Sequence, residues 1–190
     1  MTITAKIEGI SPMCFGRFHN TPKLTKEAHD DYEKRTWREK LHSDAEGFVY
    51  ATPMMFKNCI AAAAKYLSVH IPGKGKATYT KHFEAGVLVN DTVYILKDGE
   101  KIKKDDVEGY WMLVPADGRR GGTKRVQKCF PKIQEGWEAE IKFHILDSTI
   151  TADVFEQHLK EAGNFIGIGS FRPRNNGYFG RFKVKSIEVM

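Results

Sequence analysis

The chain has 190 residues, of which 41% are hydrophobic and 28% are charged, so it is long enough to bury a core as one domain. Its formal net charge of +6 favours anionic partners such as nucleic acid. The three cysteines, Cys14, Cys59 and Cys129, are far apart and form no CxxC pair, which argues against a disulfide framework and a zinc module.

The longest apolar run, residues 60–64, is far too short to span a membrane, and the N-terminal residues lack a signal-peptide run. Together with the unpaired cysteines, this predicts a cytoplasmic protein that does not interact with a membrane. No HExxH motif or Cys/His cluster is present, so no metal and no cofactor is expected.

The first third contains a strand, a charged segment and a helix. Apolar residues alternate from Ile3, predicting a strand over residues 3–18 that breaks near Gly9 and Pro12. Residues 20–43 are highly charged, and they predict a long loop with a frayed helix. A short strand at 47–51 leads into a helix that runs to about Ser68, with Thr52 as its cap and Pro53 at its first position.

One buried face of this helix is marked by Phe56, Ile60, Ala63 and Leu67. Lys57 lies off that face in the first turn, where a cation opposes the helix dipole and favours an anionic partner. Solubility alone is the other explanation for this lysine.

The central segment is rich in strands and loops. Residues 70–79 predict a loop, residues 83–89 and 92–96 two strands joined by a turn, and residues 110–114 a further strand. Residues 115–128 then hold five basic side chains against one acid, on a backbone with three glycines. This pattern predicts an exposed arm that phosphate contacts could order, or else a flexible basic loop without a partner.

The last third repeats the order of the first. Residues 137–146 alternate like a half-buried strand, and a helix capped by Thr151 is expected to end at Gly163. The glycine-rich stretch, residues 165–184, is expected to form a strand, a loop and a final strand that ends at Val189. Two strand-helix-strand units would thus enclose the central segment.

The glycine-rich stretch interleaves glycine, arginine and aromatic residues without an acidic side chain. Glycines permit close backbone approach, arginines bind phosphates, and exposed aromatic faces stack on bases. The alternative is a final hairpin whose phenylalanines, Phe171, Phe179 and Phe182, belong to the core.

Three stretches resemble a known family: residues 7–16 (IEGISPMCFG), residues 50–60 (YATPMMFKNCI) and the glycine-rich residues 167–182. They are similar to the opening strand, the strand-to-helix entry and the C-terminal glycine-rich loop of the RAMP superfamily. These are ferredoxin-like RNA-binding proteins of CRISPR complexes, and they include guide-RNA backbone subunits and guide-processing endoribonucleases. The chain has Met54-Met55 where the family often has serines, and it is shorter than typical backbone subunits. A stand-alone relative encoded by a virus or mobile element is therefore an equal alternative to a CRISPR subunit.

The resemblance implies a single α+β domain over residues 1–190. Its core would be a ferredoxin-like (RRM-like) βαββαβ unit with an antiparallel sheet. A helical or loop region at about 20–45, and strands with a basic arm at about 70–132, would be inserted into it.

The leading functional hypothesis is sequence-independent binding of single-stranded nucleic acid, with RNA favoured over DNA. The chain would act as a homo-oligomer along the strand or as a subunit of a ribonucleoprotein. Phosphate-binding and base-stacking roles fall to nine residues: Lys57, Arg119, Arg120, Lys124, Arg125, Arg172, Arg174, Tyr178 and Arg181.

Two alternatives belong to other classes. One is a metal-independent endoribonuclease, for which His19 and His42 are the candidate acid and base. His144 and His158 are interpreted as core histidines. The other alternative is a protein-binding mimic that caps or inhibits a CRISPR or recombination assembly, in defence or counter-defence.

Overall fold

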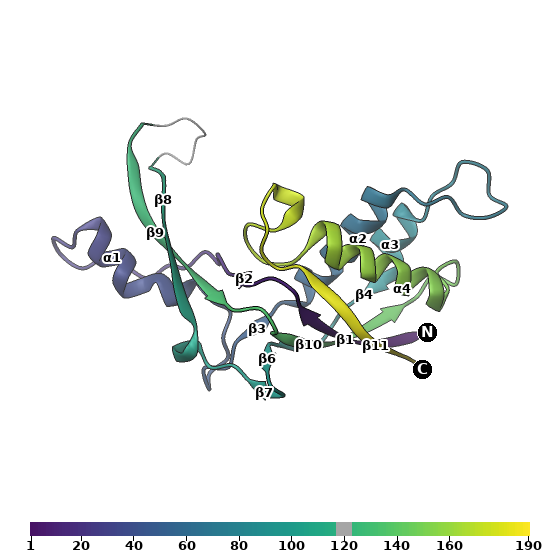
Figure 1. Cartoon of the computed structure of the whole chain (residues 1–190), viewed down its shortest axis with the longest axis horizontal. Coiled ribbons are helices and arrows are strands. Elements are labelled where there is room, and N and C mark those ends of the chain that lie inside the picture. The colour runs from purple at the N-terminus through teal and green to yellow at the C-terminus, as the bar shows by residue number, and fades with distance from the viewer. Residues whose placement is uncertain (117–122) are drawn as a thin grey trace.

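The computed structural model describes residues 1–116 and 123–190, and it is a mixed α/β structure with antiparallel sheets (Figure 1). The main sheet has β1 (Thr2–Gly9) between β11 (Phe182–Val189) and β10 (Glu138–Ile145). Beyond β10, β4 (Val87–Leu88) pairs with one end of that strand, and the hairpin of β6 (Leu96–Lys97) and β7 (Glu100–Lys101) pairs with the other. The predicted antiparallel sheet is therefore present.

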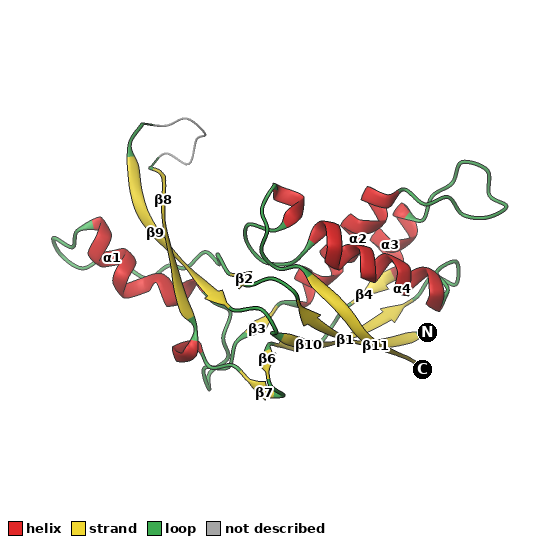
Figure 2. Cartoon of the chain, viewed as in Figure 1, coloured by secondary structure: helices red, strands yellow, loops and turns green. Residues whose placement is uncertain are grey.

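Three helices, α2 (Pro53–Leu67), α3 (Thr80–Gly86) and α4 (Ala152–Glu161), lie together on one side of this sheet (Figure 2). The alternation along β1 explains the arrangement, because Ile3, Ala5 and Ile7 are buried. The intervening side chains face the opposite side, where Lys6 and Glu140 form an exposed ion pair at 3.5 Å. Among the described residues, no helix combines the length and apolar character needed to cross a membrane.

The two predicted helices begin where the sequence indicates but differ in detail. The predicted capping bond of Thr52 is wrong, because its side chain makes none in the structure. The Thr151 cap is confirmed, since its hydroxyl accepts a hydrogen bond from the Val154 N–H at 3.3 Å. The second helix does not end at Gly163; it continues into a π-helical turn, Ala162–Ile166. At Gly163 a side chain would collide with the Phe182 carbonyl, so this glycine serves close packing rather than termination.

A second unit stands apart from the main sheet (Figure 1). It is a three-stranded antiparallel sheet in the order β2 (Met13–Cys14), β9 (Arg125–Ile133), β8 (Glu108–Pro115). The helix α1 (His29–Thr36) and the 3-10 turn Trp37–Lys40 pack against β9. A separate pair joins β3 (Tyr50–Ala51) to β5 (Val93–Tyr94). The charged segment predicted as a loop with a frayed helix is thus a loop over residues 20–28, followed by a helix that packs on a sheet.

Three local predictions are wrong. Residues 83–89 are not a strand, because α3 occupies most of them and Phe83 packs its ring against His158 at 4.4 Å. No hairpin turns at 90–91, since β4 pairs with β10 while β5 pairs with β3. The first strand expected in the glycine-rich stretch is reduced to one bridge, Ser170 with Cys14, followed by a 3-10 turn, Pro173–Asn175.

Candidate nucleic-acid interface

The glycine-rich stretch lies directly on β2. The Ser170 N–H donates to the Cys14 carbonyl at 2.8 Å, and the Gly180 N–H donates to the Pro12 carbonyl at 2.7 Å. Gly169 has φ +78°, and a side chain there would collide with the Cys14 carbonyl. Only glycine permits so close a backbone contact. The glycine-rich stretch therefore lies directly beside the residues that follow β2.

A pocket of about 300 Å³, which we call the glycine-loop pocket, lies between this stretch, the end of β2 and the start of α2. None of the described residues that line it is acidic. Its polar lining residues come from four segments of the chain: Arg17, His42, Thr52, Asn58, Ser170 and Arg172. This composition suits an anion or a polar ligand edge.

A larger hollow of about 640 Å³, which we call the hairpin groove, lies beside the β8–β9 hairpin. Gly16 and Arg17 line both hollows, so the two meet at these residues. The groove is rich in rings, including Phe18, which is 84% exposed. Its other rings are those of His19, Tyr32, Phe130 and Phe171.

The two arginines of the glycine-loop pocket form no salt bridge within the described part of the chain. Arg17 donates from Nη1 to the Leu41 carbonyl at 3.4 Å, a long contact. The buried Nε of Arg172 has no hydrogen-bond partner among the described residues. A buried guanidinium nitrogen without a partner is costly, and a bound anion would satisfy it.

The two candidate histidines lie in different hollows. His19 lines the hairpin groove, and burial, followed by the nearby Lys40 ammonium, lowers its pKa. His42 lines the glycine-loop pocket, and burial, followed by Arg17, lowers its pKa. Both imidazoles are therefore predominantly neutral at pH 7. His158, interpreted from sequence as a core residue, is fully buried and hydrogen-bonds the Val154 carbonyl at 2.7 Å.

The glycine-rich candidates differ in how exposed they are. Arg172 lines the glycine-loop pocket, and Arg174 is exposed on the adjacent 3-10 turn. Tyr178 is 58% exposed, with its ring 4.9 Å from that of Phe179. The guanidinium of Arg181 donates to the Asn164 carbonyl and so braces the loop.

The phenylalanines of this stretch divide between core and surface. Phe182 is buried, as the hairpin alternative predicts. Phe171 and Phe179 are half-buried. The Phe171 ring packs on Phe130 of β9, and the Phe179 ring packs on Tyr110 of β8.

The remaining candidates lie elsewhere. The Lys57 ammonium donates to the Glu84 carbonyl at 2.7 Å, at the end of α3, and lines neither hollow. Lys124 and Arg125 are exposed at the start of β9. Arg119 and Arg120 lie outside the described residues.

Arg17, Phe18 and Asn58 are among the lining residues of the two hollows to which the sequence assigned no role. The sequence signal that could have identified Arg17 as a site residue is its position after Gly16, at the end of the first predicted strand. Its partnership with Arg172 arises only because the glycine-rich stretch returns to β2.

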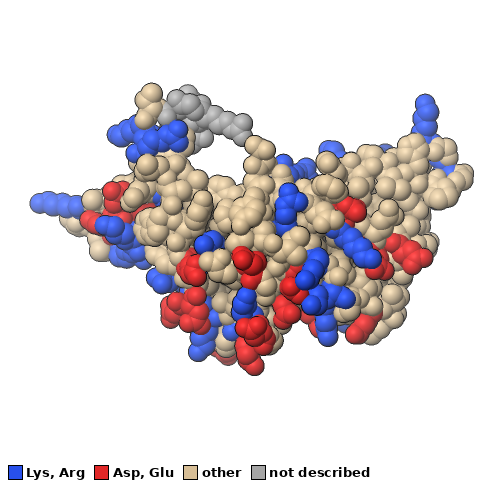
Figure 3. Space-filling view, in the orientation of Figure 1, with Lys and Arg blue, Asp and Glu red and all other residues tan. Residues whose placement is uncertain are grey.

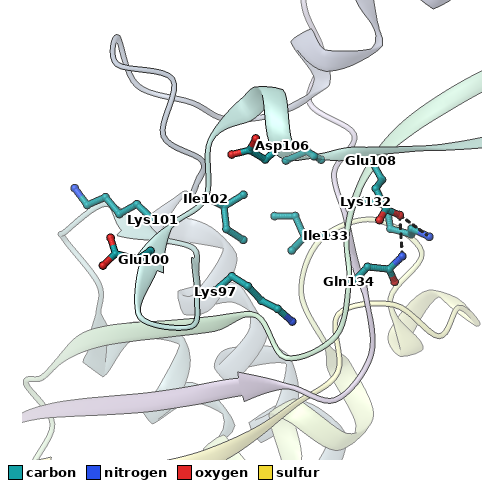
Figure 4. Close-up of a pocket in the computed structure, with 10 residues that line it drawn as sticks. Lys97, Glu100, Lys101, Ile102, Asp106, Glu108, Lys132, Ile133 and Gln134 are labelled. Atoms are coloured by element: carbon teal, nitrogen blue, oxygen red, sulfur yellow. Dashed lines mark hydrogen bonds and ion pairs between the residues drawn. The ribbon is translucent and has the colours of Figure 1, made fainter.

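A third hollow, of about 340 Å³, lies at the base of the β8–β9 hairpin (Figure 4). Its floor is apolar, with Ile102 and Ile133, and charged side chains surround it. Most of these charges already have partners: Lys97 donates to the Glu135 carbonyl, and Glu108 contacts Lys132 and Gln134. We assign it no ligand.

No protein-family model matches this chain, and no curated protein matches it. Two solved structures are similar to it in fold. A chain in the cryo-EM structure of the type III-B Cmr-beta bound to cognate target RNA has a TM-score of 0.59 and 11% identity, over 100% of this chain and 60% of that chain. Cmr6 from Pyrococcus furiosus has a TM-score of 0.52 and 12% identity, over 97% of this chain and 98% of that chain. These similarities support a RAMP-like fold and, at such identity, show the fold alone.

Proposed function

We propose that this chain binds single-stranded RNA as a subunit of a CRISPR-type ribonucleoprotein. The observation that carries the proposal is a pair of hollows that share Gly16 and Arg17. One holds two arginines without an ion pair among the described residues, and the other is lined by aromatic rings, of which Phe18 is exposed. The similarity in fold to a chain of an RNA-bound Cmr complex favours RNA over DNA.

A ferredoxin-like core is part of this proposal. Four strands lie in the order β11, β1, β10, β4, and all of their pairings are antiparallel. In chain order, β1, α2, β4, β10, α4 and β11 follow the βαββαβ pattern. The β8–β9 hairpin and the α1 region would then be insertions into that core, as the sequence resemblance implies.

Binding would divide between charge and stacking. Arg17 and Arg172 hold phosphate oxygens in the glycine-loop pocket, with Arg174 and the exposed Lys124 and Arg125 as outer contacts. Phe18 and Tyr178 present faces on which bases stack without regard to sequence. The expectation that copies assemble along the strand remains part of the proposal.

Fluorescence anisotropy with labelled single-stranded RNA tests the proposal. Nuclease-treated protein should bind RNA at low salt and release it as the salt concentration rises, because neutralised phosphates regain their counterions. Single-stranded DNA and duplex RNA of the same length are the comparison ligands. Absence of RNA binding at low salt would contradict the proposal.

The endoribonuclease alternative has one observation in its favour: His19 and His42 line the two hollows that share Arg17. One neutral imidazole would accept the proton of a 2′-hydroxyl that attacks phosphorus, and the other, in its protonated form, would give a proton to the departing 5′-oxygen, with Arg17 stabilising the transition state. Denaturing electrophoresis of labelled hairpin RNA, incubated with the protein and a chelator, distinguishes RNA cleavage from RNA binding alone. Intact RNA that is still bound excludes the nuclease.

Mass photometry distinguishes the protein-binding alternative from assembly on RNA. Complexes whose mass grows with RNA length favour assembly along the strand. A fixed stoichiometry with a protein partner and no RNA favours a mimic or inhibitor.

A further inference from the structure

The outer edge of β8 is apolar and free of charge between its two end residues, Glu108 and Pro115. Between Gly109 and Val114 there is no charged side chain, and the pairing of β8 with β9 runs from Glu108 to Pro115 without a shift in register. Trp111 and Leu113 are 41% and 61% exposed. An edge with these properties readily accepts another strand.

The alternation of hydrogen bonds shows which groups point outward. The Ala116 N–H donates to the Lys124 carbonyl, so even-numbered residues of β8 bond to β9. On the same pattern, Cys129 directs its backbone groups to the far side of β9, where Glu33 and Lys40 bind them. The backbone groups of Gly109, Trp111 and Leu113 therefore face away from β9, and no partner is recorded for them within the described residues.

Other sheet edges of the molecule are protected. The free edge of β9 is closed by Glu33 and Lys40. The outer strand β11 carries Lys183, Lys185 and Glu188, and its pairing with β1 contains a bulge. On β8 the charged Glu108 and Pro115 stand at the two ends, and the edge from Gly109 to Val114 between them carries no such device.

We propose that the β8 edge pairs antiparallel with β8 of a second copy of this chain, about a two-fold axis at Trp111. This register places Gly109 opposite Leu113 of the second copy, so the large side chain meets the residue without one. The two Trp111 rings lie side by side on the same face. All outward-facing backbone groups of the three residues find partners.

The charges along the hairpin are complementary in this pairing. Asp105 and Asp106 precede β8 at the hairpin base, whereas Lys124 and Arg125 lie near its tip, where Figure 3 shows basic side chains gathered. Antiparallel pairing points the acidic base of one copy toward the basic tip of the other, whose Lys124 and Arg125 lie on the β9 side, one strand behind the paired edge. The base lysines are engaged elsewhere, since Lys104 pairs with Glu39 and Lys103 lies over Phe48.

This dimer is closed by its symmetry and forms without RNA, so it does not depend on the proposed function. Light scattering or sedimentation of nuclease-treated protein measures it. The wild-type chain should be dimeric. Leu113→Lys and Leu113→Pro should each weaken the dimer at least about tenfold, because one adds a charge and the other removes an outward N–H.

Leu146→Lys is the matched control, since Leu146 is 68% exposed and distant in sequence from β8, and it should leave the dimer intact. Circular dichroism checks that each variant is folded. A monomeric wild-type chain, or a dimer unaffected by both Leu113 variants, would overturn the proposal.

Discussion

The buried carboxylate of Glu33 accepts a hydrogen bond from the backbone N–H of Cys129 at 2.7 Å. Lys40 is ion-paired with the same carboxylate and donates to the Cys129 carbonyl at 2.7 Å. Two side chains from α1 and the turn after it thus take the place of a neighbouring strand on the free edge of β9. The orientation of the β8–β9 hairpin, and with it one wall of the hairpin groove, rests on this ion pair.

Glu33→Gln should therefore destabilise the protein strongly. The change leaves the Lys40 ammonium buried without its counter-charge, and such losses cost about 3–5 kcal/mol. Urea denaturation followed by circular dichroism measures the change in the free energy of unfolding. The control is Glu39→Gln, which removes an ion pair to Lys104 that is far more exposed and should cost no more than about 1 kcal/mol. Equal effects of the two variants would contradict the structural role of Glu33.

The same carboxylate predicts a pH dependence of stability. Burial raises the pKa of Glu33, but hydrogen bonds from Lys40 and the Cys129 N–H, with the charge of Lys128, bring it below the ordinary value. A lowered pKa in the folded state stabilises the fold above the unfolded value of about 4.3, and this contribution is lost as the pH falls through the folded value. The stability difference between wild type and Glu33→Gln should hold at neutral pH and shrink below about pH 4. Denaturation series at several pH values test this, and a difference independent of pH would contradict it.

RNA binding should depend on Arg17 and Arg172 more than on Lys57. Loss of both arginines should weaken binding and reduce the slope of log K against log salt by about 1.4, since each phosphate contact to a single strand contributes about 0.7. Lys57→Ala should leave the slope unchanged because its ammonium is bound to the Glu84 carbonyl. Anisotropy titrations at several salt concentrations measure the slope. The residue assignment fails if Lys57→Ala changes the slope as much as the arginine pair does.

Stacking on Phe18 and Tyr178 predicts a different signature. Phe18→Ala and Tyr178→Ala should each weaken binding by about 1–3 kcal/mol per lost base contact, with little change in the salt slope. Leu24→Ala is a control, since this side chain is 61% exposed and lines neither hollow. RNA carrying 2-aminopurine reports stacking through its fluorescence. A fall in the salt slope for either ring variant would count against stacking.

Much of the fold could be predicted because its signals are local. The apolar spacing of α2 and α4 and the alternation in β1 and β10 each lie within one segment, and those elements form where expected. The prediction of a strand over residues 83–89 was wrong because the deciding contact is not local. Their composition suits a strand, but the contact of Phe83 with His158, far along the chain, favours a helix.

The residues of the candidate site also divide into those with a local sequence signal and those without one. Arg172 and Tyr178 could be found because glycine, arginine and aromatic residues gather in one stretch. Arg17 could not, because its role depends on the hydrogen bond between Ser170 and Cys14, which joins opposite ends of the chain. Lys57 and Arg181 were chosen by charge, and the backbone carbonyls that engage them are visible only in three dimensions.

The final prediction concerns the backbone of the glycine-rich stretch. Gly180 has φ +74°, and a side chain there would collide with the Ile168 carbonyl, whereas Gly75 has φ +58° and open space within 4 Å. Both Gly180→Ala and Gly75→Ala incur the left-handed backbone cost of about 1–2 kcal/mol. Only Gly180→Ala must also displace the loop, so it should be the more destabilising in urea and should weaken RNA binding, while Gly75→Ala leaves binding unchanged. Equal stability losses with unchanged RNA affinity would mean that the close approach of Gly180 to Ile168 does not hold the glycine-loop pocket in place.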